Sequence, residues 1–252
     1  MKISKIHIIT PIITRGIRTE DDSKPFLRPD LEVSYSLLDI GPATIESEVD
    51  EALAVPDTIK KAIEAENNGA DAIIIDCMGD PGLNACREAV SIPVIGPCQT
   101  SIHFAAMLGG MFSFITVLDR LRPMIKHIIS GYGLEGSYAS FEAVNVAVLD
   151  IEGSLEQLNI GLTEKSIKAV TEDHAGAIVL GCTGFLGCAE EITKGLLAKG
   201  INVPVIDPIP LAIHVADTLI KTGLTHSKSV YPFPGKKKRV GFDIPDFNNQ
   251  LN

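Results

Sequence analysis

The same arrangement occurs twice in this sequence of 252 residues, and it limits the folds that the chain can adopt. In residues 67–97 and again in residues 173–208, a helical stretch ends and a short apolar run follows, which closes on a cysteine and a turn containing glycine. A second helical stretch then leads to a Pro-Val-Ile-x-Pro segment. Short β-branched runs that alternate with amphipathic helical stretches predict βαβ units and a parallel sheet.

The pattern predicts short strands and intervening helices along the whole chain. We expect strands at Lys5–Thr10, Leu31–Leu37, Ala72–Asp76, Val94–Ile95, Ser113–Val117, Ala143–Leu149, Ala177–Gly181 and Val203–Ile206. We expect helices at residues 50–69, 80–90, 119–133, 163–174, 189–200 and 210–223. Any doubly wound sheet repeats such units, but a cysteine at the same point of each repeat favours two similar α/β lobes. The predicted first lobe is residues 1–98 with 208–252, and the second is residues 99–207.

Composition and charge exclude several classes of protein. Hydrophobic residues make up 45% of the chain and charged residues 21%, as in ordinary globular proteins. No apolar run approaches the roughly 20 residues that span a bilayer, and the N-terminus lacks the layout of a signal peptide, so we expect a cytoplasmic protein without a membrane partner. The net charge of −10 disfavours binding to nucleic acid. The basic cluster at residues 235–239 is expected to be a solvated tail.

Most of the five cysteines and six histidines are not expected to carry chemistry. The odd number of cysteines and the lack of C-x-x-C spacing argue against a disulfide framework and a structural zinc site. Cys86 and Cys188 fall in predicted helices as buried apolar residues, and Cys98 falls in a predicted loop. The histidines lack metal-ligand spacing, and the chain has no dinucleotide, P-loop or serine-hydrolase motif. We therefore expect no metal and no cofactor.

Cys77 and Cys182 are different, because each follows a predicted strand at its carboxyl end, where open α/β sheets bind ligands. Asp80 and Pro81 predict that a helix starts directly after Cys77, and a similar start is expected after Cys182. The N–H groups and the dipole at a helix start lower the pKa of a nearby thiol from about 8.5 and can bind an anion. Thr183 adds a hydroxyl donor.

Two thiols that face each other across a substrate suit the inversion of a carbon acid. A single base returns the proton to the side from which it came, so inversion needs a second acid on the opposite face. One alternative is a decarboxylase or a cis–trans isomerase, in which one cysteine is the proton donor or nucleophile. Another is a non-catalytic, two-lobed protein that binds a small molecule and has two inert thiols.

The chain resembles the aspartate/glutamate/hydantoin racemase superfamily, and within it the hydantoin and allantoin racemases. The resemblance is carried by DCMGDPGL at 76–83, VLGCTG at 179–184, PVID at 204–207 and GLTHSK at 223–228. These motifs occur in the family's order, and the resemblance as a whole covers about nine tenths of the chain.

The resemblance implies two Rossmann-like lobes related by a pseudo-twofold axis, with the active site in the cleft between them. It also implies racemisation of a small molecule without a cofactor, a homo-oligomer, and an acid/base pair formed by Cys77 and Cys182. Thr116 matches a polar position that commonly lines the cleft. The residues expected to bind substrate are Pro11, Ile12, Met78, Gly79, Asp80, Gln99, Thr100, Thr116, Thr183, Gly184 and Phe185.

The chain departs from the pattern of the hydantoin and allantoin racemases at two positions. Ile12 stands where these racemases commonly have asparagine after the first strand, and Gln99 stands near a common glutamate. These replacements change the polarity and the hydrogen bonding offered to a ligand. The charged stretch at residues 15–30 is expected to be an exposed loop, with a mobile lip over the cleft as the alternative.

Overall fold

The computed structural model describes residues 3–17, 22, 24–25, 28–242 and 244–245. The chain divides into two compact units. The first consists of Met1–Ile45, Val49–Gly96 and Ala212–Asn252, and the second of Glu46–Glu48 and Pro97–Leu211. The boundaries predicted from the sequence lie at residues 98 and 207. The prediction places Glu46–Glu48 in the first lobe, whereas the structure places this segment in the second unit.

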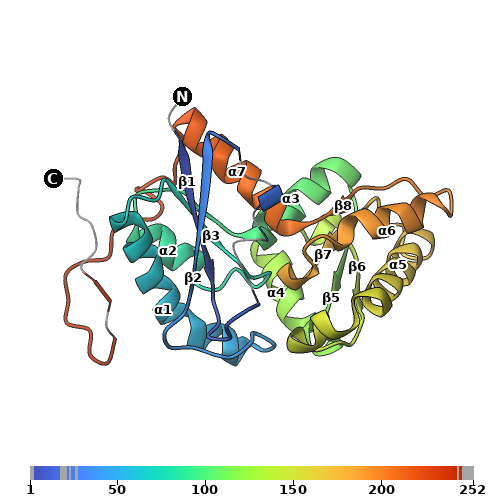
Figure 1. Cartoon of the computed structure of the whole chain (residues 1–252), viewed down its shortest axis with the longest axis horizontal. Coiled ribbons are helices and arrows are strands. Elements are labelled where there is room, and N and C mark those ends of the chain that lie inside the picture. Colours follow the sequence, from blue (N-terminus) through green and yellow to red (C-terminus); the bar gives the residue numbers. More distant parts are fainter. Residues whose placement is uncertain (1–2, 18–21, 23, 26–27, 243, 246–252) are drawn as a thin grey trace. The chain divides into compact units, whose positions relative to one another are not determined.

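Each unit is built on a four-stranded parallel sheet with the same strand order (Figure 1). The order in the first unit is β2-β1-β3-β4, and in the second it is β6-β5-β7-β8. The strands are β1 (Ser4–Thr10), β2 (Leu31–Leu37), β3 (Ala72–Ile75), β4 (Val94–Ile95), β5 (Phe112–Thr116), β6 (Tyr138–Ala143), β7 (Ala177–Leu180) and β8 (Val205–Ile206). The predicted α/β fold with two parallel sheets is confirmed.

Seven α-helices connect and cover these strands in the described part of the chain. They are α1 (Glu48–Asn67), α2 (Leu83–Ala89), α3 (Pro97–Gly109), α4 (Arg122–Gly131), α5 (Leu155–Thr171), α6 (Cys188–Leu197) and α7 (Pro208–Thr222). Short 3-10 helices include η4 (Val148–Ser154) and η5 (Thr183–Phe185).

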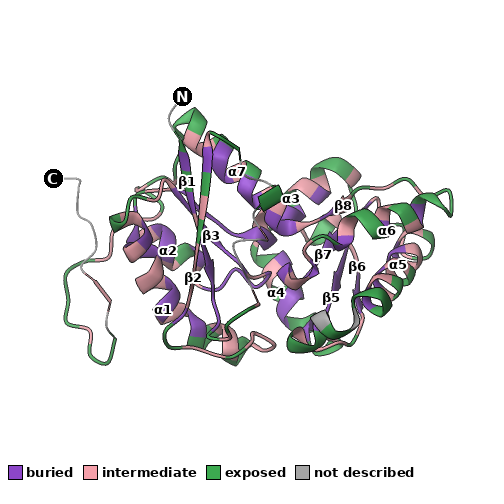
Figure 2. Ribbon diagram, in the orientation of Figure 1, coloured by how far each residue is buried: buried purple, intermediate pink, exposed green. Residues whose placement is uncertain are grey.

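The middle strands form the core of each unit. Every residue of β3, β5 and β7 is buried, and Figure 2 shows these strands buried in both sheets. Strand β1 is covered on both faces: the Ser4 hydroxyl donates a hydrogen bond to Asp217 of α7, whereas His7 lies beside Lys61 of α1. Side chains alternate between the faces of a strand, so α7 and α1 cover opposite faces of β1.

The structure differs from the sequence prediction at β6, α3 and α5. The strand expected at residues 143–149 lies earlier, at 138–143, because Asn145 adopts the left-handed conformation (φ 57°) and interrupts the extended chain. Helix α3 was not predicted, and Cys98 lies buried in its first turn rather than in a loop. Its first residue, Pro97, suits a helix start because proline lacks an N–H group. Helix α5 begins at Leu155, well before residue 163.

The surface predictions have mixed outcomes. Lys236, Lys237 and Lys238 are exposed in a segment without helix or strand, as expected for a solvated tail. Within the described residues, no helix combines the length and the apolar character needed to cross a membrane. The loop predicted at residues 15–30 lies partly outside the described residues, which exclude 18–21, 23, 26 and 27.

A segment after α7 ties together α2 and β4. The Val94 N–H donates a hydrogen bond to His226 Nε2 (2.9 Å), and the Lys228 ammonium donates to the carbonyl oxygens of Arg87 (2.7 Å) and Val90 at the end of α2. Carbonyls at a helix C-terminus lack partners within the helix, and a cation there is stabilising. The GLTHSK motif therefore holds the end of α2 and the edge strand of the first sheet.

The His226 contact makes stability depend on pH. Burial lowers the pKa of His226 to about 4, and the charges of Arg87 and Lys228 add to the shift. Between its ordinary pKa near 6.5 and this value, the unfolded chain binds a proton that the folded chain does not, so stability falls as the pH falls. The ring is only partly buried, so we expect a loss of about 1–2 kcal/mol in the free energy of unfolding.

Urea unfolding at pH 7 and pH 4.5 measures this loss, and His226→Gln should lose less. An equal loss in the variant would contradict the assignment.

Candidate functional site

The two candidate cysteines occupy matching places in the two sheets. Cys77 lies two residues after the end of β3, and Cys182 lies two residues after the end of β7. Each of these strands has the same position in its sheet, beside the last strand of the order. Both cysteines are reduced thiols and half-buried, whereas the other three cysteines are buried. The two cysteines that the sequence predicts as functional are therefore more exposed than the other three.

Each sulfur accepts a hydrogen bond from the glycine two residues further along. The Gly79 N–H lies 3.4 Å from Cys77 Sγ, and the Gly184 N–H lies 3.4 Å from Cys182 Sγ. A hydrogen bond to sulfur favours the charged thiolate over the thiol. The same local geometry therefore prepares both cysteines to act as a base.

The predicted helix start after Cys77 is wrong in its position. Asp80 adopts the left-handed conformation (φ 50°) in a turn, and α2 begins only at Leu83, after the left-handed Gly82. Helix α6 likewise begins after the left-handed Gly187. The α-helices therefore start six residues beyond their cysteines. The start expected after Cys182 is present as the 3-10 helix η5, in which Cys182 is the N-cap and its sulfur accepts the Gly184 N–H. After Cys77, the N–H donor comes from a turn.

A threonine supports each cysteine from the neighbouring strand. The Thr10 hydroxyl, at the end of β1, donates a hydrogen bond to the Asp76 carboxylate (3.1 Å). The Thr116 hydroxyl, at the end of β5, donates to the Gly181 carbonyl (2.7 Å). Asp76 and Gly181 each immediately precede the cysteine. Thr116 was expected to line the ligand site, but it is fully buried. Its hydroxyl instead fixes the backbone at Gly181, the residue before Cys182.

In the first unit, the other predicted ligand residues follow β1 or belong to the Cys77 turn. Pro11, Ile12, Met78 and Asp80 are buried. The Asp80 carboxylate lies against Gly96, because a β-carbon at position 96 would be 2.5 Å from Asp80 Oδ2.

Glu51 was not predicted as part of the site. It lies in the first turn of α1, and its carboxylate covers Gly79, because a β-carbon at Gly79 would be 2.8 Å from Glu51 Oε1. The signal available in the sequence was an acidic residue near a helix start, which is common for stability alone.

In the second unit, the predicted ligand residues come from α3 and from the Cys182 turn. Gln99 and Thr100 lie half-buried in the first turn of α3. Thr183 and Phe185 are buried in η5, with Phe185 fully so. Phe185 therefore anchors the turn by packing.

The three remaining cysteines are unsuited to acid/base chemistry. Burial raises the pKa of Cys86 to about 12 and that of Cys188 to about 11. Cys98 has no exposed surface. The packing role predicted for Cys86 and Cys188 fits this burial.

This difference predicts which cysteines react in the folded protein. At pH 7.5 we expect iodoacetamide to label Cys77 and Cys182 at least about tenfold faster than the three buried cysteines, because the thiolate is the nucleophile and access is required. Peptide mass spectrometry over a time course measures each rate. Labelling of Cys86 as fast as Cys182, before unfolding, would contradict the structure.

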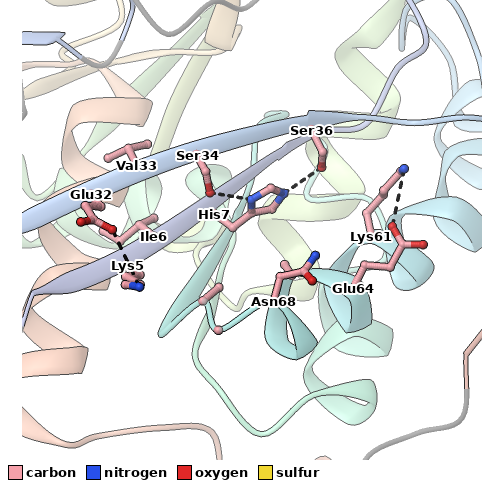
Figure 3. A pocket seen from close by; sticks show the side chains of 13 residues that line it. Lys5, Ile6, His7, Glu32, Val33, Ser34, Ser36, Lys61, Glu64 and Asn68 are labelled. Atoms are coloured by element: carbon pink, nitrogen blue, oxygen red, sulfur yellow. Dashed lines mark hydrogen bonds and ion pairs between the residues drawn. The ribbon is translucent and has the colours of Figure 1, made fainter.

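A separate pocket of about 480 Å³ lies in the first unit, between strands β1 and β2 and the second half of α1 (Figure 3). The His7 ring in this pocket is bonded on both sides, 2.8 Å from the Ser34 hydroxyl and 2.8 Å from the Ser36 hydroxyl. Lys61 pairs with Glu64 at 3.6 Å. The polar groups of His7 and Lys61 thus have partners within the pocket, and neither candidate cysteine lines it. Among the described residues, no group of three histidine, cysteine or acidic side chains is placed to hold a metal.

The structure is that of an α/β protein with two similar sheets. At the same point of each sheet lies a half-buried cysteine whose sulfur accepts a glycine N–H. The model of a family described as Asp/Glu/Hydantoin racemase matches residues 23–216. A hydantoin racemase from Pseudomonas sp. (strain NS671) is 36% identical over 94% of this chain and 94% of its own. The chain belongs to the Asp/Glu/hydantoin racemase family, and it is an enzyme of the racemase class.

Solved structures agree with this assignment. The allantoin racemase from Klebsiella pneumoniae superposes with a TM-score of 0.87 and 32% identity, covering 94% of this chain and 96% of its own. A variant of arylmalonate decarboxylase in its liganded form has a TM-score of 0.64 at 17% identity, covering 87% of this chain and 94% of its own. This second likeness extends to the fold alone.

Proposed function

We propose that the chain is a cofactor-independent racemase that inverts a carbon acid next to a carbonyl, with Cys77 and Cys182 as its acid/base pair. The observation that carries this proposal is the matched hydrogen bond of 3.4 Å from a glycine N–H to each sulfur. A reaction that uses one base in one direction and the other base in reverse needs two equivalent thiols. An enzyme in which only one cysteine takes part in the reaction does not need the hydrogen bond to the second sulfur.

The reaction proceeds through one proton removal and one proton return. The thiolate of one cysteine takes the proton from the carbon, and the electron pair of the C–H bond moves onto the carbonyl oxygen as an enolate. The thiol of the other cysteine gives its proton to the opposite face, and the electron pair returns to form the new C–H bond. The first cysteine ends as a thiol and the second as a thiolate, so charge and atoms balance without a cofactor.

We propose a cyclic ureide or amide of the hydantoin or allantoin kind as the substrate, because the similar enzymes carry those names. Such a substrate has an acidic C–H between a ring nitrogen and a carbonyl, and its product is its mirror image. Ile12 and Gln99 offer an alkyl group and a neutral amide to the ligand. These side chains suit an uncharged ring better than a second carboxylate.

Polarimetry on enantiopure 5-substituted hydantoins and allantoin tests this function. We expect optical rotation to decay to zero, while NMR shows that the amount of substrate is constant. Release of CO₂ from an added malonate would instead favour a decarboxylase. Unchanged rotation for the whole set, with folded protein, would contradict the proposal.

A further inference from the structure

The pocket between β1, β2 and the second half of α1 is lined mainly by polar side chains (Figure 3). Its floor includes the face of β2 that carries Ser34 and Ser36, because alternate residues of a strand share one face. Its wall includes the small residues Ala65, Gly69 and Ala70. These small side chains leave a volume of about 480 Å³, which is within the range of about 300–1,000 Å³ that small-molecule sites occupy.

The floor of the pocket holds a histidine between two hydroxyl groups. His7 Nδ1 lies 2.8 Å from the Ser34 hydroxyl, and His7 Nε2 lies 2.8 Å from the Ser36 hydroxyl. Burial lowers the pKa of His7, and the charge of Lys61 adds to the shift, so the ring is neutral at pH 7. A neutral ring has one N–H donor and one acceptor nitrogen. One serine therefore accepts from the ring and keeps its own O–H donor, while the other donates to the ring and keeps its lone pairs.

The charged side chains that line the pocket form two ion pairs. Lys5 lies 4.0 Å from Glu32, and Lys61 Nζ lies 3.6 Å from Glu64 Oε2. Figure 3 shows these pairs at opposite ends of the row formed by Ser34, His7 and Ser36. Two positive and two negative charges cancel, so the pocket does not favour a ligand with a net charge of one sign. A ligand with one charge of each sign matches this balance.

The Lys61–Glu64 pair presents opposite charges at the spacing found in an amino acid. Residues three apart lie on the same face of a helix, and the two side chains are 14% and 37% exposed. Lys61 also pairs with Asp39 (2.9 Å), which pairs with Lys60 (3.4 Å), so the neighbouring charges cancel as well. Standard bond lengths place the ammonium nitrogen and a carboxylate oxygen of an α-amino acid about 3 Å apart. This spacing is close to the 3.6 Å between Lys61 and Glu64.

We propose that this pocket is a second small-molecule site, which binds an α-amino acid with a polar, uncharged side chain. The carboxylate of the ligand lies at Lys61 and its ammonium at Glu64, while its side chain lies along the serine hydroxyls of the floor. An ammonium has three donors and a carboxylate accepts about four hydrogen bonds, so both can serve a ligand and keep their present partners. A side chain that ends in an amide offers both a donor and an acceptor to the two serines. The site does not involve the two cysteines, so the inference does not depend on the proposed reaction.

NMR titration of ¹⁵N-labelled protein with L-glutamine tests the site and its location. We expect the amide signals of Ser34, Ser36 and Asn68 to shift and saturate with a Kd of about 1 mM, because partly exposed ion pairs each contribute little. The signals of Gly79 and Gly184, in the cysteine turns, should not move. Pocket signals that do not shift up to about 10 mM L-glutamine would overturn the inference. Shifts confined to the cysteine turns would also overturn it.

Two analogues of L-glutamine test the class of ligand on the wild-type protein. Glutaramate lacks the ammonium group, and γ-aminobutyramide lacks the carboxylate. We expect each analogue to bind at least about threefold more weakly than L-glutamine, because each loses one charge-assisted contact. Glutaramate that binds as tightly as L-glutamine would show that the pocket takes an anion, and equally tight γ-aminobutyramide would show that it takes a cation. Either result would overturn the inference.

Lys61→Met and Glu64→Gln test the two charged partners. Each should weaken the binding of L-glutamine by about three- to tenfold. Lys194→Met is the matched control, because Lys194 pairs with Glu191, three residues away on α6, at 2.8 Å and lies outside the pocket. It should leave the Kd unchanged. Binding of wild-type strength in folded Lys61→Met and Glu64→Gln would overturn the inference, and if Lys61→Met does not fold, Glu64→Gln and the two analogues decide it.

Discussion

Replacement of either Cys77 or Cys182 by serine is expected to lower kcat/KM for racemisation by at least about a hundredfold, because acid/base catalysis by a positioned group contributes at least that much. Serine keeps the approximate size of the side chain and can accept the hydrogen bond from Gly79 or Gly184. It does not ionise near neutral pH, so it is a poor base. Polarimetry in both directions, starting from each enantiomer, gives the two rates.

Cys86→Ala is the matched control, because Cys86 is a buried cysteine of α2 with a raised pKa and no place in the proposed reaction. We expect this variant to retain nearly all of the wild-type activity. Full activity in either serine variant, with the unfolding midpoint unchanged, would show that the reaction does not need both thiols.

Gly181→Ala is expected to destabilise the second unit strongly. A β-carbon at Gly181 would overlap the Phe114 ring, which is fully buried in the middle of the sheet. Overpacking of a rigid core costs about 3 kcal/mol at sites of this kind, which corresponds to a fall of roughly 6 °C or more in the unfolding midpoint of a chain of this size. Differential scanning calorimetry of the purified variant measures the shift.

Gly131→Ala separates this clash from the general effect of replacing glycine. Gly131 is the last residue of α4, and a β-carbon there would meet nothing within 4 Å. Alanine is a better helix former than glycine, so the midpoint should stay constant or rise slightly. Equal destabilisation by the two substitutions would contradict the packing described around Cys182.

Much of the fold could be predicted because its strands are short, buried and rich in β-branched residues. The predictions for β2 and β4 match the observed bounds. The strand β6 was misplaced because Val144, Val146 and Val148 look like a strand, while the break depends on the conformation of Asn145. Helix α3 was missed because its first turn, Pro97–Thr100, reads as a loop by composition.

The sequence predicted the two cysteines of the candidate site but not the residues around them. The repeat pointed to Cys77 and Cys182, and the structure gives both the same backbone donor. The donor was assigned to a helix start, which the structure shows as a 3-10 helix after Cys182, whereas after Cys77 the donor lies in a turn and α2 begins only after the left-handed Gly82. Glu51 could not be predicted, because its place over Gly79 depends on how α1 packs against the loop. Such a contact joins segments that are distant in the sequence, so no local sequence pattern predicts it.

The fate of deuterium during the first part of the reaction tests the two-thiol claim most directly. The wild-type enzyme is supplied with one enantiomer in D₂O, and the reaction is stopped at low conversion. Two opposed thiols predict that the product enantiomer carries deuterium while the remaining substrate keeps its proton, since each thiol exchanges with solvent and acts on one face. Deuterium that enters the remaining substrate as fast as the product, or a product that retains the original proton, would contradict the account.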